Sequence, residues 1–263
     1  MKSFEFHRPQ SVPDAVALLR GNDGAKLLAG GQSLLPVLKL DLAQPSDLVS
    51  LAAIRTLREI GDTDPLMIGA LATHDEVSAS PVVRRRISGL AVLAGGIGDA
   101  QVRNRGTIGG SLAHADPAAD YPAAVLALGA TIETDRRRIA ADDYFTGLFT
   151  TALAPDEIIT SVHFPVPERS GYAKFASRAS KYALVGVFVA KTRGGVRVAV
   201  TGAGSHAFRV PALEKALNDR FAPDAVTPGA VSAGDLRSDA EASAEYRAHL
   251  VTVMARRAVQ ACQ

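Results

Sequence analysis

Short apolar segments alternate with longer segments whose apolar residues have helical spacing along the first 164 residues. Apolar runs bounded by turn residues are typical of strands, and apolar residues three or four positions apart are typical of helices. Ser11 ahead of Pro13 predicts the start of the first helix, because Ser caps free backbone N–H groups and Pro favours the first turn. The expected strands are residues 4–6, 26–29, 47–51, 65–70, 130–134, 138–140 and 157–164. The expected helices are residues 12–20, 34–40, 73–77, 81–87, 89–95 and 116–128, the last of them begun by Asp116 and Pro117.

The best candidate for a domain boundary is residues 164–171, where two prolines and a glycine resist both helix and sheet. Beyond it the pattern changes to strand-like runs with a Gly194–Gly195 hairpin turn, followed by helical segments. The expected strands are residues 172–177, 183–191 and 196–201, and the expected helices are residues 211–218 and 241–261. The pattern therefore predicts an α+β fold, with a larger domain over residues 1–166 and a smaller one over residues 167–263.

Composition narrows the classes of partner and compartment. The 263 residues are 47% apolar and 21% charged, which is ordinary for a soluble globular protein. With Lys+Arg at 29 and Asp+Glu at 27, the net charge of +2 offers no electrostatic case for nucleic acid. The single cysteine, Cys262, excludes an intrachain disulfide and a thiolate cluster held by this chain. We find no secretory signal and no apolar run near the ~18 residues of a membrane span, so we expect a cytoplasmic protein.

Two glycine motifs carry the most specific chemistry. Glycines let the backbone turn tightly, so that successive N–H groups point into a concavity suited to phosphate. One such motif alone would be an ordinary strand-to-helix turn, but two of them could hold the two phosphates of one diphosphate. Neither is followed by the Gly-Lys-Ser/Thr of a nucleotide-hydrolysing loop, so the pair predicts a dinucleotide cofactor. The motif residues are Ala29, Gly30, Gly31, Gln32 and Ser33, and Thr107, Ile108, Gly109, Gly110 and Ser111.

Two other patterns are weaker. Residues 202–207 fit the G-x-G-x-x-A form of a nicotinamide or flavin fingerprint, but no second strand follows to complete the βαβ unit. His114, Asp116 and Asp120 form a polar cluster, yet one His and two Asp in a short segment are poor evidence for a metal site. We expect no metal ligands in this chain and no catalytic acid or base.

Several stretches resemble the FAD-binding medium subunit of the xanthine dehydrogenase and aerobic carbon monoxide dehydrogenase family, the molybdenum hydroxylases. The resemblance runs from Phe4 to the last helix, and the two glycine motifs in this order are its most specific part. The similar stretches are residues 28–36, 102–120, 155–159, 172–175, 198–204 and 242–247. The resemblance implies a fold of two FAD-binding subdomains of the PCMH type, at about residues 1–55 and 56–166. A C-terminal three-stranded antiparallel sheet with a helical bundle would follow.

The resemblance also implies roles for single residues. The two glycine motifs would cradle the FAD diphosphate, and Asp120 would hold ribityl or ribose hydroxyls. Tyr182 would lie over the isoalloxazine face, although Lys181 beside it replaces an acidic residue common in relatives. Gln32 stands where related oxidases tether flavin through a histidine, so the FAD should be noncovalent. Apolar contacts to the cofactor would come from Ile97 and Ile159, and Lys174 would sit near the polar edge of the flavin.

The function implied by the resemblance is electron relay. A large molybdopterin subunit would oxidise the substrate, and a small subunit would pass the electrons through two [2Fe-2S] clusters to FAD in this chain. FAD would deliver them to an external acceptor, and the complex would be a dimer of heterotrimers. Three alternatives stay open: a stand-alone FAD-dependent reductase of the same fold, a nicotinamide-binding module built on Gly202–Ala207, and an interaction subunit without cofactor. Neither the substrate nor the acceptor can be predicted from this chain.

Overall fold

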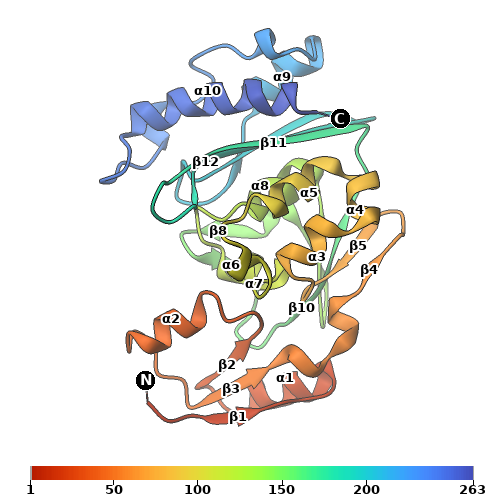
Figure 1. The fold of residues 1–263 in the computed structure, drawn as a ribbon, viewed down its shortest axis with the longest axis vertical. Coiled ribbons are helices and arrows are strands. Elements are labelled where there is room, and N and C mark those ends of the chain that lie inside the picture. Colours follow the sequence, from red (N-terminus) through yellow and green to blue (C-terminus); the bar gives the residue numbers. More distant parts are fainter. Residues whose placement is uncertain (1, 263) are drawn as a thin grey trace.

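The N-terminal part of the chain forms a small parallel sheet with two helices. The computed structural model describes residues 2–262 (Figure 1). Its first sheet has the order β1-β3-β2 and pairs all strands in parallel. These strands are β1 (Glu5–His7), β2 (Ala25–Leu28) and β3 (Asp47–Ser50), and the helices are α1 (Val12–Gly21) and α2 (Leu34–Lys39). Ser11 accepts a hydrogen bond from the Asp14 N–H at the start of α1, which confirms the predicted cap.

The central part is an antiparallel sheet of five strands in the order β4-β5-β10-β6-β7. Its strands are β4 (Ile60–Gly61), β5 (Leu66–Gly69), β6 (Thr131–Thr134), β7 (Arg138–Ala140) and β10 (Ile159–Phe164), with a hairpin of β8 (Phe145–Gly147) and β9 (Thr150–Thr151) nearby. Its helices are α3 (His74–Ala79), α4 (Pro81–Arg86), α5 (Ser88–Gly95), α6 (Ala100–Arg103), α7 (Ile108–His114) and α8 (Tyr121–Leu128). Fully buried side chains such as Ile68, Leu90 and Val125 join sheet and helices in one hydrophobic core.

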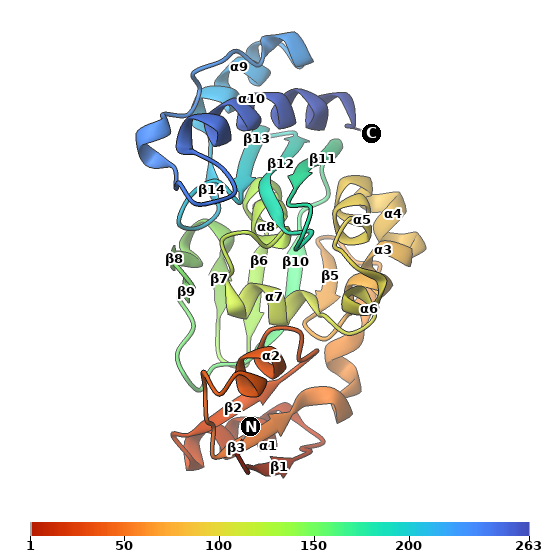
Figure 2. The ribbon, with the colours of Figure 1, turned by 60° about the vertical axis from the view of Figure 1, so that its left-hand side comes forward.

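The C-terminal part is a second antiparallel sheet with a helix layer on one face (Figure 2). Its strands are β11 (Arg169–Ala176), β12 (Ala183–Thr192), β13 (Gly195–Thr201) and β14 (Phe208–Arg209), and its helices are α9 (Pro211–Asp219) and α10 (Ala244–Gln260). Successive residues of β12 point to opposite faces of the sheet and belong to two different hydrophobic cores. Val187 packs with Leu250 of α10, while Phe188 belongs to the core with α8. The sheet thus lies between the central helices and α10.

The C-terminal arrangement corrects two expectations. The sheet has four strands rather than three, because Phe208–Arg209 pairs with β13. A strand of two residues is too short to show an alternating pattern. In the described part of this region, the expected bundle is replaced by α9 and α10 lying on the sheet, joined by irregular chain with two 3₁₀ turns at Pro223–Ala225 and Ala233–Asp235.

Three further features differ from expectation. The helix expected from Asp116 begins only at Tyr121, because Asp116 instead closes a tight turn by accepting the Ala118 N–H at 2.8 Å. The second glycine motif is not a free turn, since its residues form the first turn of α7. Strand β11 begins at Arg169, inside the segment expected to resist regular structure. Among residues 2–262, no helix combines the length and apolar character needed to cross a membrane.

Candidate cofactor site

The first glycine motif forms a turn with free backbone donors. Strand β2 ends at Leu28, Gly31 adopts a left-handed φ of +75°, and α2 begins at Leu34. Within residues 2–262, the N–H groups of Gly31, Gln32 and Ser33 make no hydrogen bond. These residues are not fully buried, so the unpaired donors are accessible to a ligand. Such a run of N–H groups is suited to an anion.

The fold brings the two glycine motifs into contact. A Cβ added at Gly30 would lie 2.0 Å from the Arg105 carbonyl oxygen and 2.9 Å from the Gly106 Cα. A Cβ at Gly110 would lie 3.8 Å from the Cβ of Ala29. Only glycine at position 30 allows the first turn to approach the second segment so closely. The two motifs therefore lie side by side, although 78 residues separate Ala29 from Thr107.

The second motif differs from the expected set of free amides. The Ile108 and Gly109 N–H groups donate to the carbonyls of Ala72 and Ala70, at 3.1 and 2.8 Å. The Gly110 N–H donates to Thr107 Oγ1 at 3.1 Å, so Thr107 caps α7. The expectation of a second nest of unpaired amides is therefore wrong at these three positions. The Ser111 side chain, without a hydrogen bond among the described residues, is the polar group still available here.

Asp120 lies at the centre of a buried polar group where the central part meets the C-terminal sheet. Only 5% of Asp120 is exposed, and its carboxylate accepts a short hydrogen bond from the Tyr172 hydroxyl. The Lys174 ammonium lies 3.0 Å from Asp120 Oδ1. Burial raises the pKa of the Asp120 carboxyl, while Lys174 and Tyr172 oppose that shift.

Tyr182 lies close to this group on the loop between β11 and β12. The ring is 44% exposed. Burial raises the pKa of the Tyr182 hydroxyl, with further contributions from the charges of Asp116 and Asp120. The structure thus brings Asp120, Lys174 and Tyr182 together from segments that are distant in sequence.

The two predicted apolar contacts differ in accessibility. Ile97 is half-buried in the loop after α5, and its carbonyl accepts a hydrogen bond from Arg103 at 2.7 Å. Ile159 is only 5% exposed at the start of β10 and belongs to the central core. Ile97 therefore offers more surface to a ligand than Ile159 does.

His74 is a residue whose place the sequence did not reveal. Its ring is buried, lies 5.3 Å from the Tyr121 ring, and would touch a Cβ at Gly106 through Nε2. Burial, with the positive charge of Arg103, lowers the pKa of His74 to about 4. His74 thus packs as a neutral ring against the backbone of Gly106, the residue just before the second motif. The one local signal was the Thr73–Glu76 capping box, which fixes His74 at the first helical position.

The alternative fingerprint at residues 202–207 lacks the structure that it requires. Gly202 ends β13 with a φ of +82°, and the chain continues into β14, which pairs antiparallel with β13. A dinucleotide fingerprint needs a helix directly after the glycines and then a parallel strand. The Gly202 N–H and carbonyl are also engaged, by the Pro117 carbonyl and the Arg247 guanidinium.

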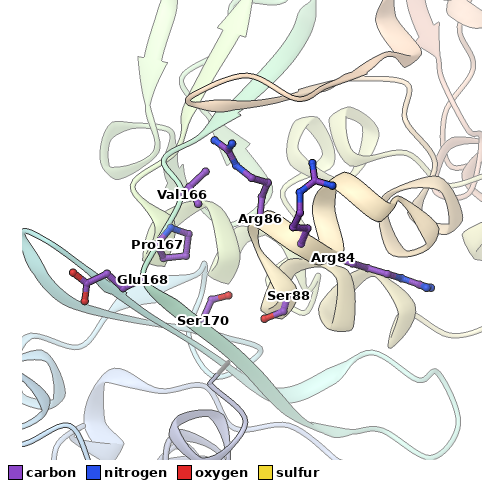
Figure 3. Close-up of a pocket in the computed structure, with 8 residues that line it drawn as sticks. Arg84, Arg86, Ser88, Val166, Pro167, Glu168 and Ser170 are labelled. Atoms are coloured by element: carbon purple, nitrogen blue, oxygen red, sulfur yellow. The ribbon is translucent and has the colours of Figure 1, made fainter.

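A separate hollow of about 340 Å³ lies at the junction of α4 with the segment between β10 and β11 (Figure 3). It contains none of the predicted site residues. Arg84 and Arg86 point in different directions in Figure 3, so their guanidinium groups do not converge on one ligand. The lining residues are Arg84, Arg85, Arg86, Ser88, Val166, Pro167, Glu168 and Ser170. Among residues 2–262, no group of three His, Cys, Asp or Glu side chains could hold a metal ion.

Comparison with known proteins defines the class. Residues 2–167 match the family described as "FAD binding domain in molybdopterin dehydrogenase". The chain is 40% identical to the nicotine 6-hydroxylase medium subunit of Paenarthrobacter nicotinovorans, over 98% of this chain and 97% of that one. It is 36% identical to the carbon monoxide dehydrogenase medium chain of Hydrogenophaga pseudoflava, over 98% and 96%. The structure superposes on a chain of the solved carbon monoxide dehydrogenase of Hydrogenophaga pseudoflava with a TM-score of 0.90, covering 99% and 97% at 36% identity.

The matched family and the superposition define an FAD-binding protein of the molybdopterin dehydrogenase type. The chain belongs to this family, and within it to the FAD-binding medium subunits of molybdenum hydroxylases. The polar groups at the two motifs and at Asp120 fit the cofactor. Three unpaired N–H groups suit a diphosphate, and Asp120 has acceptor capacity left for a sugar hydroxyl.

Proposed function

We propose that this chain holds FAD noncovalently at the two glycine motifs and relays electrons within a molybdenum hydroxylase complex. The observation that carries the proposal is the contact of Gly30 with Arg105–Gly106, which sets the free amides of the first motif beside α7. When bound, FAD would supply the redox chemistry that links [2Fe-2S] clusters of a partner subunit to an external acceptor. This chain binds and orients the cofactor and contributes no acid or base.

The first motif would bind the diphosphate through the N–H groups of Gly31, Gln32 and Ser33. From the second motif, the Ser111 hydroxyl would donate to a phosphate oxygen, while Thr107 and Ile108 fix α7 in place. Gly110 has no side chain to fill the space between α7 and Ala29. The diphosphate thus receives direct bonds mainly from one motif, with the other forming the wall.

The remaining contacts would orient the sugar and ring portions. Asp120 would accept a hydrogen bond from a ribityl or ribose hydroxyl, and Tyr182 would cover one face of the isoalloxazine ring. Ile97 would make the larger apolar contact and Ile159 the smaller one, in line with their exposure. Gln32 supports a noncovalent cofactor, because its amide cannot form the bond that a histidine makes to a flavin.

The proposal also covers the domains of the chain and the complex in which it acts. Residues 1–166 would be the FAD-binding domain, with subdomains at about 1–55 and 56–166, and residues 167–263 the second domain. The names of the related medium subunits support a small and a large partner subunit. In this proposal the small partner carries the [2Fe-2S] clusters and the large partner the molybdopterin cofactor. The assembly would be a dimer of heterotrimers in the cytoplasm.

The test is to isolate the chain with its bound partners through an affinity tag and to analyse the complex. We expect one FAD per chain, with iron and molybdenum in companion subunits, and flavin bleaching when the substrate of the complex is added. An FAD-containing single chain without metals, active alone with a nicotinamide donor, would instead support the stand-alone reductase. A colourless chain with nicotinamide affinity would favour the nicotinamide-binding module.

A further inference from the structure

The loop that carries Tyr182 is short and closed upon itself. The Ser177 N–H donates to the Tyr182 carbonyl at 2.8 Å, and the Lys181 N–H donates to the Ser177 carbonyl at 3.1 Å. The Ser180 N–H donates to Ser177 Oγ at 3.3 Å. Because these bonds link its two ends, the loop is held together as one unit. Contacts between the loop and the rest of the chain therefore set the position of the Tyr182 ring.

Lys174 provides such an outside contact. Its ammonium donates to the Lys181 carbonyl at 3.3 Å and lies 3.0 and 3.2 Å from the two oxygens of Asp120. An ammonium group has three N–H donors and no acceptor. Asp120 Oδ2 and the Lys181 carbonyl accept hydrogen bonds from this ammonium, and Asp120 Oδ1 lies within ion-pair distance at 3.0 Å. With only 12% of its side chain exposed, Lys174 thus has Asp120 and the loop as its partners.

Gly98 provides a second contact to the loop. A Cβ at Gly98 would lie 2.6 Å from the Cβ of Lys181, so the loop rests directly on the backbone after α5. Lys181 itself has a left-handed φ of +64°, which places its carbonyl within reach of Lys174. The loop is thus held by the Gly98 contact, by the Lys174 ammonium and, at its first residue, by the bond from the Ser177 hydroxyl to Glu241 at 2.6 Å.

From these contacts we infer that Lys174 is a positioning residue, which holds the 177–182 loop through the Lys181 carbonyl so that Tyr182 covers the flavin. This inference rests on the proposed function and replaces a direct contact of Lys174 with the flavin edge. Asp120 holds the ammonium in place and keeps acceptor capacity for a sugar hydroxyl. The cofactor and the loop are therefore linked through one carboxylate and one ammonium.

The experiment compares Lys174→Met, Gly98→Ala and Tyr182→Leu in the FAD-loaded complex, with Lys191→Met as the control. Met keeps the length of the side chain and removes the ammonium. Gly98→Ala displaces the loop without touching Asp120 or Lys174, so it also serves if Lys174→Met folds poorly. The ammonium of Lys191 lies 5.5 Å from the Phe221 ring, in contact with neither Asp120 nor the loop. Flavin fluorescence is the main readout, because an aromatic ring stacked on a flavin quenches it, and FAD content is measured in parallel.

We expect Lys174→Met and Gly98→Ala to retain FAD and to lose the quenching to the same extent as Tyr182→Leu, while Lys191→Met matches the wild type. FAD-loaded Lys174→Met and Gly98→Ala proteins with wild-type fluorescence would overturn the inference. Loss of FAD in Lys174→Met alone would identify Lys174 as a cofactor ligand and overturn the inference while the proposed function stands. A wild-type chain that bound no FAD would overturn the proposed function itself.

Discussion

The contact between the glycine motifs can be broken with one methyl group. In Gly30→Ala, the new Cβ would lie 2.0 Å from the Arg105 carbonyl oxygen and 2.7 Å from its carbon. Both atoms belong to the backbone, so no side-chain rotation relieves the overlap. Ordinary contact begins at 3.4 Å, so the two segments must separate by about 1.4 Å. The first motif would move away from α7, and the proposed site would lose its shape.

Overpacking of this kind costs about 1–3 kcal/mol. If the two segments separate in the free chain, FAD binding must bring them together again. That cost would weaken FAD binding by roughly 10–100-fold. If the same strain stays in the free chain, the melting temperature falls instead, by about 2–4 °C for each 1 kcal/mol. Titration of the apoprotein with FAD, followed by flavin fluorescence, measures the loss of affinity. Thermal melts of the apoprotein measure the fall in melting temperature.

Two glycine variants calibrate this result. Gly21→Ala introduces a Cβ with nothing within 4 Å and should leave FAD affinity unchanged. Gly110→Ala meets only Thr107 Oγ1 at 2.9 Å and the Ala29 Cβ at 3.8 Å, so it should have an intermediate effect. A Gly30→Ala chain with wild-type FAD affinity and an unchanged apoprotein melting temperature would show that the two motifs do not touch.

Three further predictions concern ionisable groups. Arg137 holds the pKa of the buried Glu157 at about 2, so its contribution to stability is present above pH 4.5 and is lost as the pH falls towards 2. Glu157→Gln should lower the free energy of unfolding at pH 7 by about 2–3 kcal/mol in denaturant titrations, and equal stability would contradict the pairing. Burial lowers the pKa of His74 from 6.5 to about 4, so the unfolded chain takes up a proton first and stability should fall between pH 6.5 and 4. That decline should disappear in His74→Gln, and its persistence would assign it to another group. Burial raises the pKa of the Cys262 thiol to about 12, so iodoacetamide at pH 8 should label it only after unfolding, and rapid native labelling would count against its burial.

Local chemistry made several elements predictable. Ser11 caps α1 as expected, and the strands around the Gly194–Gly195 turn match the predicted runs closely. Both signals lie within a few neighbouring residues. The start of α8 was missed because an Asp-Pro pair can begin either a helix or a tight turn. Asp116 begins a tight turn, which its bond from the Ala118 N–H closes.

The parts of the site that depend on distant partners were not predictable. Whether the Gly109 amide is free depends on Ala70, which lies on another segment. The sequence motif was therefore interpreted as a nest when its donors were already engaged. Likewise, Lys174 is 54 residues from Asp120, and nothing in the pattern shows that its ammonium bonds to Asp120 and to the Lys181 carbonyl. The resemblance predicts the site residues, whereas only the fold shows which of their atoms remain available.

A crystal or cryo-electron microscopy structure of the FAD-loaded complex is the decisive measurement. We predict that diphosphate oxygens lie within hydrogen-bond distance of the Gly31, Gln32 and Ser33 N–H groups, with α7 forming the opposite wall. A flavin dinucleotide bound elsewhere, for example at Gly202–Ala207, with those three amides facing only solvent, would contradict the proposed site.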